Sequence, residues 1–262
     1  MTGAAPTLVL WDIDRTLLYV GNVDRRVYRE TFAEVVGRPA EQLPARGTGI
    51  TMPSAIQALL LDNGVPEPEV EALLPRMVEL LPKRLADHME DLQREGFLMP
   101  GAIDALRAVH DQPGLVPTVV TGNLKPNALI KLDAFNLTRF VDTEIGGYAS
   151  DDAHRPALVG VAQRRAKARH GFAFDRASTI IIGDSLEDVR TGKDGDVAVI
   201  GVATGTTPAA DLALAGADVV LDSLEDVERL ASAISMLTSE RSGSEVELVE
   251  AELDSKGQKD AR

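Results

Sequence analysis

Short apolar runs recur along the chain, each followed by polar or glycine residues. Five of them are Leu8–Trp11, Val116–Val120, Thr179–Ile182, Val197–Ile200 and Asp218–Leu221. They are rich in β-branched residues and lack the alternation of a half-exposed strand, which predicts strands buried on both faces of a parallel sheet. Helical patterns over residues 101–111, 156–170 and 224–237 lie between or after them. The alternation predicts an α/β fold with a Rossmann-like parallel sheet.

One region breaks this alternation, because helical patterns occur there without a convincing strand. Its length far exceeds that of an ordinary connection, which favours an all-helical insert over a long helical crossover. We therefore predict a helical cap over residues 21–95, inserted after the first strand, and an α/β core over residues 1–20 and 96–237. Within the insert, Pro75 and Pro82 predict breaks or kinks in the helix that contains them.

The C-terminal segment differs in composition from the rest of the chain. Residues 238–262 are rich in serine and glutamate and contain few large apolar side chains. Such a segment cannot bury enough apolar surface to offset the entropy of ordering, so it predicts a disordered acidic tail.

Charge and cysteine content narrow the function classes. The chain has 262 residues, of which 41 are acidic and 27 are lysine or arginine, for a net charge of −14. Nucleic acid and anionic membranes would repel such a surface, so neither is an expected partner. No cysteine is present, which excludes disulfides and thiolate metal sites. No signal peptide or membrane-spanning run is recognisable, and we expect a cytoplasmic protein.

Two carboxylates follow the first predicted strand directly. Alternation along an extended chain places Asp12 and Asp14 on the same side, at the carboxyl edge of the sheet. Ligands bind at that edge in open α/β sheets. Carboxylates so close together repel each other unless a cation or a shared proton relieves them. The alternative interpretation is a helix-capping aspartate beside a solvated one.

Two other strand ends also carry polar residues. Thr121, Gly122 and Asn123 supply a hydroxyl and backbone N–H groups that could cradle an anion, although the same tripeptide also suits an ordinary turn. Asp184 closes a fully apolar strand, and Asp188 follows one helical turn later. Asp184 either caps a helix or joins the first two aspartates in an all-oxygen magnesium site.

These polar strand ends, in this order and with a helical insert after the first, resemble the haloacid dehalogenase (HAD) superfamily. The resemblance covers roughly residues 8–235 and is greatest to phosphoglycolate phosphatase-like members with a helical C1-type cap. It implies that Asp12 is the nucleophile and that Asp14 is the general acid and base. It also implies that Thr121 holds the phosphate.

The same resemblance implies a magnesium ion as cofactor. Its ligands would be Asp12, Asp14 through its backbone carbonyl, and Asp184, with Asp188 behind them. A simple haloacid dehalogenase needs neither the second aspartate nor a metal. The resemblance therefore points to phosphoryl transfer rather than dehalogenation.

Some positions depart from the family pattern. Arg15 stands where the family usually has glycine, and residues 18–21 lack the Asp-Ser pair that phosphoglycolate phosphatases often carry, which weakens phosphoglycolate as the substrate. The third motif usually supplies a lysine, and here the equivalent position is Arg155. A guanidinium fits pairs of phosphate oxygens. Lys125 and Lys131 are rival candidates for this cation.

The predicted function is a magnesium-dependent phosphatase that hydrolyses a small phosphorylated metabolite through an aspartyl phosphate. A sugar-phosphate mutase of the same superfamily would carry the same core motifs, and a phospho-accepting signalling module is a more distant alternative. Arg46 and Thr48 lie in a cap segment that resembles the family's specificity loop, and they are predicted to bind substrate. The same segment also suits an ordinary interhelical turn.

Overall fold

The computed structural model describes residues 5–45 and 49–239. The predicted substrate-binding residues Arg46 and Thr48 lie outside these described residues. Most of the predicted acidic tail, from residue 240 onward, lies outside them as well.

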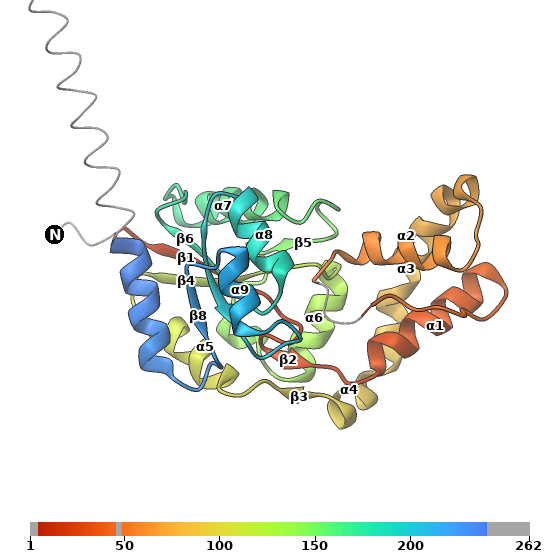
Figure 1. The fold of residues 1–262 in the computed structure, drawn as a ribbon, viewed down its shortest axis with the longest axis horizontal. Coiled ribbons are helices and arrows are strands. Elements are labelled where there is room, and N and C mark those ends of the chain that lie inside the picture. Colours follow the sequence, from red (N-terminus) through yellow and green to blue (C-terminus); the bar gives the residue numbers. More distant parts are fainter. Residues whose placement is uncertain (1–4, 46–48, 240–262) are drawn as a thin grey trace, which may run out of the picture.

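A six-stranded parallel sheet forms the centre of the larger domain, as predicted (Figure 1). Its strand order is β5-β4-β1-β6-β7-β8. The strands are β1 (Thr7–Trp11), β4 (Leu115–Thr121), β5 (Gly147–Tyr148), β6 (Thr179–Gly183), β7 (Ala198–Val202) and β8 (Val219–Leu221). Five of them are the predicted strands. The short edge strand β5 was not predicted, because two residues leave no periodic pattern.

Helices cover both faces of the sheet, which explains why its strands lack alternation. Val9 and Trp11 of β1 belong to one apolar cluster with α5, α6 and the helix of residues 227–239, whereas Leu8 and Leu10 belong to a second cluster with α7, α8 and α9. The helices are α5 (Ala102–Asp111), α6 (Lys125–Ala134), α7 (Ala157–His170), α8 (Leu186–Asp194) and α9 (Ala209–Ala215). A short 3-10 helix, η1 (Thr138–Phe140), follows α6.

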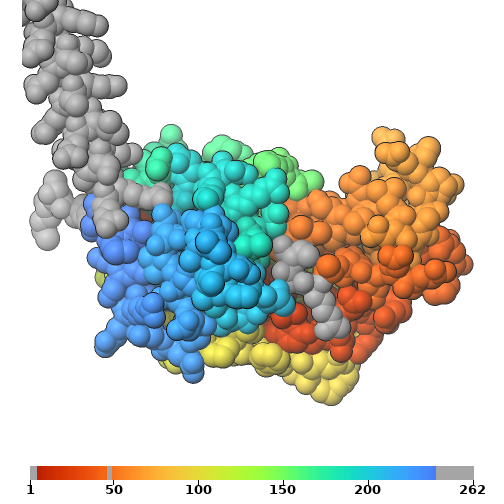
Figure 2. All heavy atoms as spheres, in the orientation of Figure 1, coloured from red at the N-terminus to blue at the C-terminus, as the bar shows by residue number. Residues whose placement is uncertain are grey.

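The chain between β1 and β4 builds a second lobe from helices, red to yellow in Figure 1 and seen in red and orange on one side of the molecule in Figure 2. Its helices are α1 (Val23–Val36), α2 (Met52–Asp62), α3 (Glu67–Asp87) and α4 (Met89–Glu95). The antiparallel pair β2 (Leu18–Tyr19) and β3 (Phe97–Leu98) brings the two ends of the insert together. The predicted helical cap after the first strand is confirmed, while its limits at residues 21 and 95 stay a prediction.

The cap helix α3 runs without interruption through Pro75 and Pro82, so a break there is wrong, while a kink stays a prediction. Pro75 is exposed and Pro82 is half-buried. They are seven residues apart and therefore lie near the same line along the helix, where water can replace the missing backbone hydrogen bonds. Buried residues on the other side, including Met77 and Leu81, hold the helix against the cap interior. Among the described residues, no helix combines the length and apolar character needed to cross a bilayer.

Candidate active site

Three polar strand ends meet at the carboxyl edge of the sheet. Trp11 of β1 lies opposite Val119 of β4 and Ile182 of β6, so the residues that follow these positions share one edge. Asp12 follows β1, Thr121 ends β4 and Asp184 follows β6. The neighbours of β1 are β4 on one side and β6 on the other, so the strand order reverses direction at β1. Open α/β sheets bind ligands at such a switch point.

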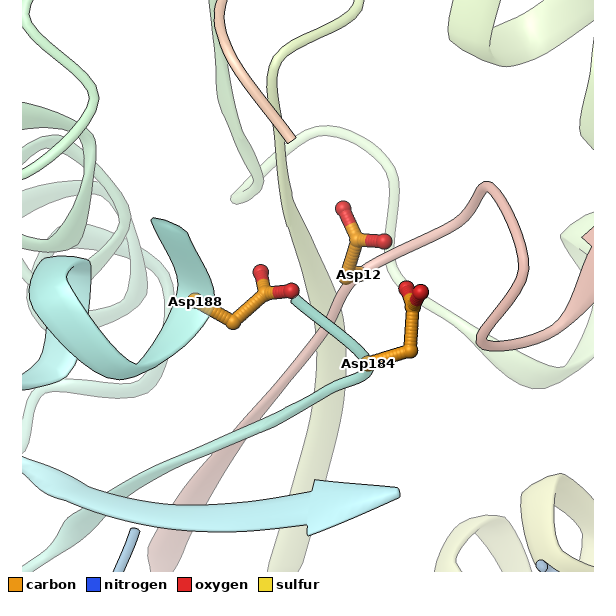
Figure 3. Close-up of side chains that lie close together, drawn as sticks. All are labelled: Asp12, Asp184 and Asp188. Atoms are coloured by element: carbon orange, nitrogen blue, oxygen red, sulfur yellow. The ribbon is translucent and has the colours of Figure 1, made fainter. Parts of the chain in front are cut away.

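Asp12, Asp184 and Asp188 form a buried acidic cluster at this edge (Figure 3). One carboxylate oxygen from each lies within 4.8 Å of the others. Burial raises the pKa of Asp12 well above its usual value, and the nearby Asp188 raises it further, while Arg155 opposes both. Burial and Asp188 also raise the pKa of Asp184 to about 7. The cluster therefore favours a bound cation or proton.

Arg155 supplies a cation to this cluster. Its Nη2 donates to Asp12 Oδ1 at 2.7 Å and to Asp188 Oδ1 at 2.5 Å, and only 3% of the residue is exposed. Burial alone would lower the pKa of its guanidinium, but Asp188 and Asp12 raise it, so the side chain stays charged. The structure thus places the predicted third-motif cation against the predicted nucleophile.

Asp188 is held from two sides. Its Oδ1 accepts from Arg155, and its Oδ2 accepts from the backbone N–H of Ser185 at 2.9 Å and from the Ser185 hydroxyl at 2.6 Å. Ser185 and Asp188 form a capping box at the start of α8. Both oxygens of Asp188 are therefore engaged, which favours a supporting role over direct metal ligation.

Thr16 links the two aspartates that lack a capping role. Its buried hydroxyl donates to Asp184 Oδ1 at 3.0 Å, with a longer contact to Asp12 Oδ2 at 3.3 Å. Thr16 belongs to the first motif, and the sequence interpretation assigned it no role.

Gly205, in the loop after β7, lies directly against Asp184. A Cβ added at Gly205 would come within 1.7 Å of Asp184 Oδ2, so the carboxylate would have to move. We expect Gly205→Ala to weaken metal activation by roughly 10–100-fold, the range for groups that orient metal ligands. A magnesium titration of activity measures this.

Gly160→Ala on α7 is the matched control, because its added Cβ meets only the end of the Arg164 side chain, at 3.3 Å. An unchanged magnesium dependence in a folded Gly205→Ala variant would contradict the prediction that Asp184 is a magnesium ligand.

Asp14 turns away from the acidic cluster toward a second cation, Lys131. The Lys131 ammonium lies 2.8 and 2.9 Å from the two oxygens of Asp14 and 2.7 Å from Asp24 Oδ2. Asn123 donates to Asp14 Oδ2 at 2.7 Å and to the Thr121 hydroxyl at 2.8 Å. The two aspartates of the first motif therefore pair with different cations: Asp12 pairs with Arg155, and Asp14 pairs with Lys131.

The other rival lysine lies outside this arrangement. Lys125 begins α6, pairs with Glu144 at 3.0 Å and is partly exposed. It contacts none of the aspartates of the site in the part of the chain that the structure describes.

The cap segment before α2 rests on the core beside this site. Met52 N–H donates to the Gly122 carbonyl at 2.7 Å, the Thr51 hydroxyl donates to the Ala153 carbonyl at 3.0 Å, and Arg155 donates to the Gly49 carbonyl. A cavity of about 180 Å³ remains between cap and core. The core contributes residues such as Asp12, Thr121 and Lys131 to its wall, and the cap contributes residues such as Tyr28 and Met52.

Arg15 adopts the backbone conformation that explains the family's preference for glycine at this position. Its φ of 66° lies in the left-handed region. Its carbonyl accepts from the Thr204 hydroxyl at 2.8 Å, and its guanidinium lies 4.6 Å from the centre of the Tyr19 ring. These contacts hold a conformation that a side chain ordinarily disfavours.

The family of haloacid dehalogenase-like hydrolases matches residues 9–193, more than half of the chain. The chain belongs to this family. It is 25% identical over 236 residues to a phosphoglycolate phosphatase of Salmonella typhi, an alignment that covers 84% of this chain and 90% of the relative. The predicted family is confirmed, and the predicted enzyme class, a phosphoric monoester hydrolase, agrees with this curated relative.

Solved structures of other proteins share the fold. A predicted phosphatase from Clostridium acetobutylicum superposes with a TM-score of 0.62 at 16% identity, covering 87% of this chain and 100% of that chain. A candidate β-phosphoglucomutase from Bacteroides vulgatus superposes with a TM-score of 0.62 at 18% identity. That superposition covers 90% of this chain and 92% of the other. At these identities the similarity establishes the fold, and the predicted fold class is confirmed.

Proposed function

We propose that this HAD-family hydrolase is a magnesium-dependent phosphatase that removes the phosphoryl group from a small phosphorylated metabolite through an aspartyl phosphate on Asp12. The observation that carries the proposal is the convergence of Asp12, Thr121 and Asp184 at one sheet edge, with Arg155 bonded to Asp12. The cavity of about 180 Å³ between cap and core supports a small substrate.

The residues present fit a magnesium ion. Asp12 and Asp184 offer carboxylate oxygens, the ligands that magnesium prefers, and their raised pKa values reflect burial and repulsion that a divalent cation would relieve. These two carboxylates would hold the ion, together with the backbone carbonyl of Asp14 that the family resemblance implies. When bound, it would offset the negative charge that gathers on the phosphoryl oxygens.

In the first step, a carboxylate oxygen of Asp12 attacks phosphorus and the ester oxygen leaves. Asp14 gives its proton to that oxygen as the bond breaks, so the product leaves as an alcohol. Arg155 offsets the repulsion between Asp12 and the phosphate dianion. The Thr121 hydroxyl and the backbone N–H of Gly122 receive the phosphoryl oxygens at the strand end.

In the second step, water attacks phosphorus and releases Asp12 as a carboxylate. Asp14, now ionised, takes the proton from that water and returns to its starting form. Covalent catalysis of this kind splits one difficult hydrolysis into two easier steps.

The mutase alternative gains nothing from the solved structures, because the relative with that description shares only 18% identity. The curated relative reported above is a phosphatase at higher identity. The proposal therefore stays with hydrolysis.

A panel of phosphorylated metabolites tests the proposal. We expect release of inorganic phosphate from at least one alkyl phosphate, abolished by a chelator and restored by magnesium but poorly by calcium, which prefers looser geometry. Ranking substrates by kcat/KM identifies the class that the cavity accepts. An isomerised sugar phosphate without phosphate release, or full activity without metal, would contradict it.

A further inference from the structure

Lys131 is buried, and its ammonium is surrounded by polar and acidic side chains. Only 2% of the residue is exposed, and it reaches the site from the last turn of α6. Its ammonium contacts Asp14, Asp24 Oδ2 at 2.7 Å and Asn123 Oδ1 at 3.0 Å, which accounts for all three N–H donors. Burial lowers the pKa of the ammonium, but Asp14 and Asp24 outweigh burial and the net shift is upward.

The contacts fix Asp14 rather than Asp12. The ammonium meets both oxygens of Asp14 at nearly equal distances, 2.8 and 2.9 Å, which sets the plane of the carboxylate. The Asn123 amide holds Oδ2 from a second direction at 2.7 Å. About a third of the Asp14 side chain stays exposed, and Asp14 lines the cavity.

Asp24 ties this arrangement to the cap. It lies in the first turn of α1, and its carboxylate receives the Lys131 ammonium from the core. Burial raises the pKa of Asp24, while Lys131 opposes that shift. Lys131 therefore joins a cap helix, a core helix and the carboxylate of the first motif through one charged group.

We propose that Lys131 is a positioning residue that aims the Asp14 carboxylate at the ester oxygen of the substrate, with Asp24 of the cap as its anchor. The inference rests on the proposed function, in which Asp14 is the proton donor. Lys131 keeps its own protons throughout. Its ammonium contacts Asp14, Asp24 and Asn123 rather than the carboxylates of Asp12 and Asp184.

The choice of leaving group separates this role from a merely structural one. An alkoxide is strongly basic and needs a proton as it leaves, whereas p-nitrophenolate leaves well without one. A misaligned Asp14 should therefore slow cleavage of an alkyl phosphate far more than cleavage of p-nitrophenyl phosphate. A general loss of structure would slow both equally.

The experiment measures release of the leaving group in a single turnover with magnesium, which isolates the first step. The substrates are glycerol phosphate, or the best alkyl substrate of the metabolite panel, and p-nitrophenyl phosphate. We expect Lys131→Met to slow the alkyl substrate by roughly 10²-fold and p-nitrophenyl phosphate by about threefold or less. Asp24→Asn should show the same selectivity at roughly tenfold, because the cation is retained but loses its charged anchor.

Lys125→Met is the matched control on the same helix, and it should leave both rates unchanged. If Lys131→Met does not fold, Asp24→Asn carries the test by itself. Equal losses on both substrates, or a change confined to KM, would overturn the positioning role.

Asp14→Asn separates this inference from the proposed function. If Asp14→Asn is selective for the alkyl substrate and the Lys131 and Asp24 variants are not, the inference is overturned and the proposed function stands. If Asp14→Asn itself shows no selectivity, Asp14 is not the proton donor, and the inference is overturned together with that step of the mechanism. Phosphatase activity through Asp12 is then judged separately by the Asp12→Asn variant.

Discussion

Asp12→Asn is expected to lose turnover by on the order of 10⁴-fold or more, because an amide cannot form the acyl phosphate and the enzyme loses its nucleophile. The substitution preserves the shape of a side chain that is only 6% exposed. Phosphate release by purified Asp12→Asn, measured with the best panel substrate and magnesium, gives the size of the loss.

The stability of the same variant should move in the opposite direction. Burial and Asp188 raise the pKa of Asp12 above its value in the unfolded chain, so the ionised carboxylate is unfavourable in the folded state at neutral pH. A neutral amide removes that penalty, and Arg155 keeps its bond to Asp188. We expect an unchanged or higher melting temperature.

A matched control is Asp62→Asn, an exposed aspartate at the end of α2, which should change neither activity nor stability. Substantial turnover by Asp12→Asn, free of hydrolysis back to aspartate as judged by mass spectrometry, would remove Asp12 as the nucleophile.

Arg155→Ala is expected to lower kcat by roughly 10²–10³-fold with a smaller change in KM, the size of effect that a preorganised electrostatic group supplies in the transition state. Arg155→Lys should recover part of the loss, because the charge remains while the planar guanidinium, whose Nη2 meets both Asp12 and Asp188, is lost. Steady-state kinetics with one substrate across both variants measure the recovery.

Arg155→Ala should also reduce stability, because it leaves Asp188 buried without its cationic partner. Arg165→Ala on α7 serves as the control, since Arg165 makes a half-exposed pair with Asp151 and lies outside the site. Near-wild-type kcat in Arg155→Ala would show that the catalytic cation comes from elsewhere.

The fold and the strand-end residues were predictable because their signals are local. An apolar run that stops at an aspartate predicts both a buried strand and a carboxylate at its end. For this reason the sequence predicts Asp12 and Asp184 at the same edge of the sheet. Arg155 was predicted from its place before α7, and it bonds to Asp12 across 143 positions of sequence. Its catalytic role stays a prediction.

The contacts that the sequence concealed depend on packing between distant segments. Nothing in the pattern of α1 distinguishes Asp24 from a solvated residue of its first turn, yet Lys131 binds it from 107 positions away. The sequence around Gly205 does not indicate why glycine is needed there. The reason is visible only in the fold, where Asp184 lies against Gly205. The sequence also did not show that the side chains of Asp12 and Asp14 meet different cations, Arg155 and Lys131.

The central claim is a covalent phosphoryl group on Asp12, and acid quenching during turnover tests it most directly. The enzyme is mixed with substrate and magnesium, quenched within one turnover, digested and analysed by mass spectrometry, with Asp12→Asn treated in parallel. The account predicts an acid-trapped phosphoryl adduct on the peptide that carries Asp12, absent from the variant. An adduct on a different residue, or none at any quench time while phosphate is released, would contradict it.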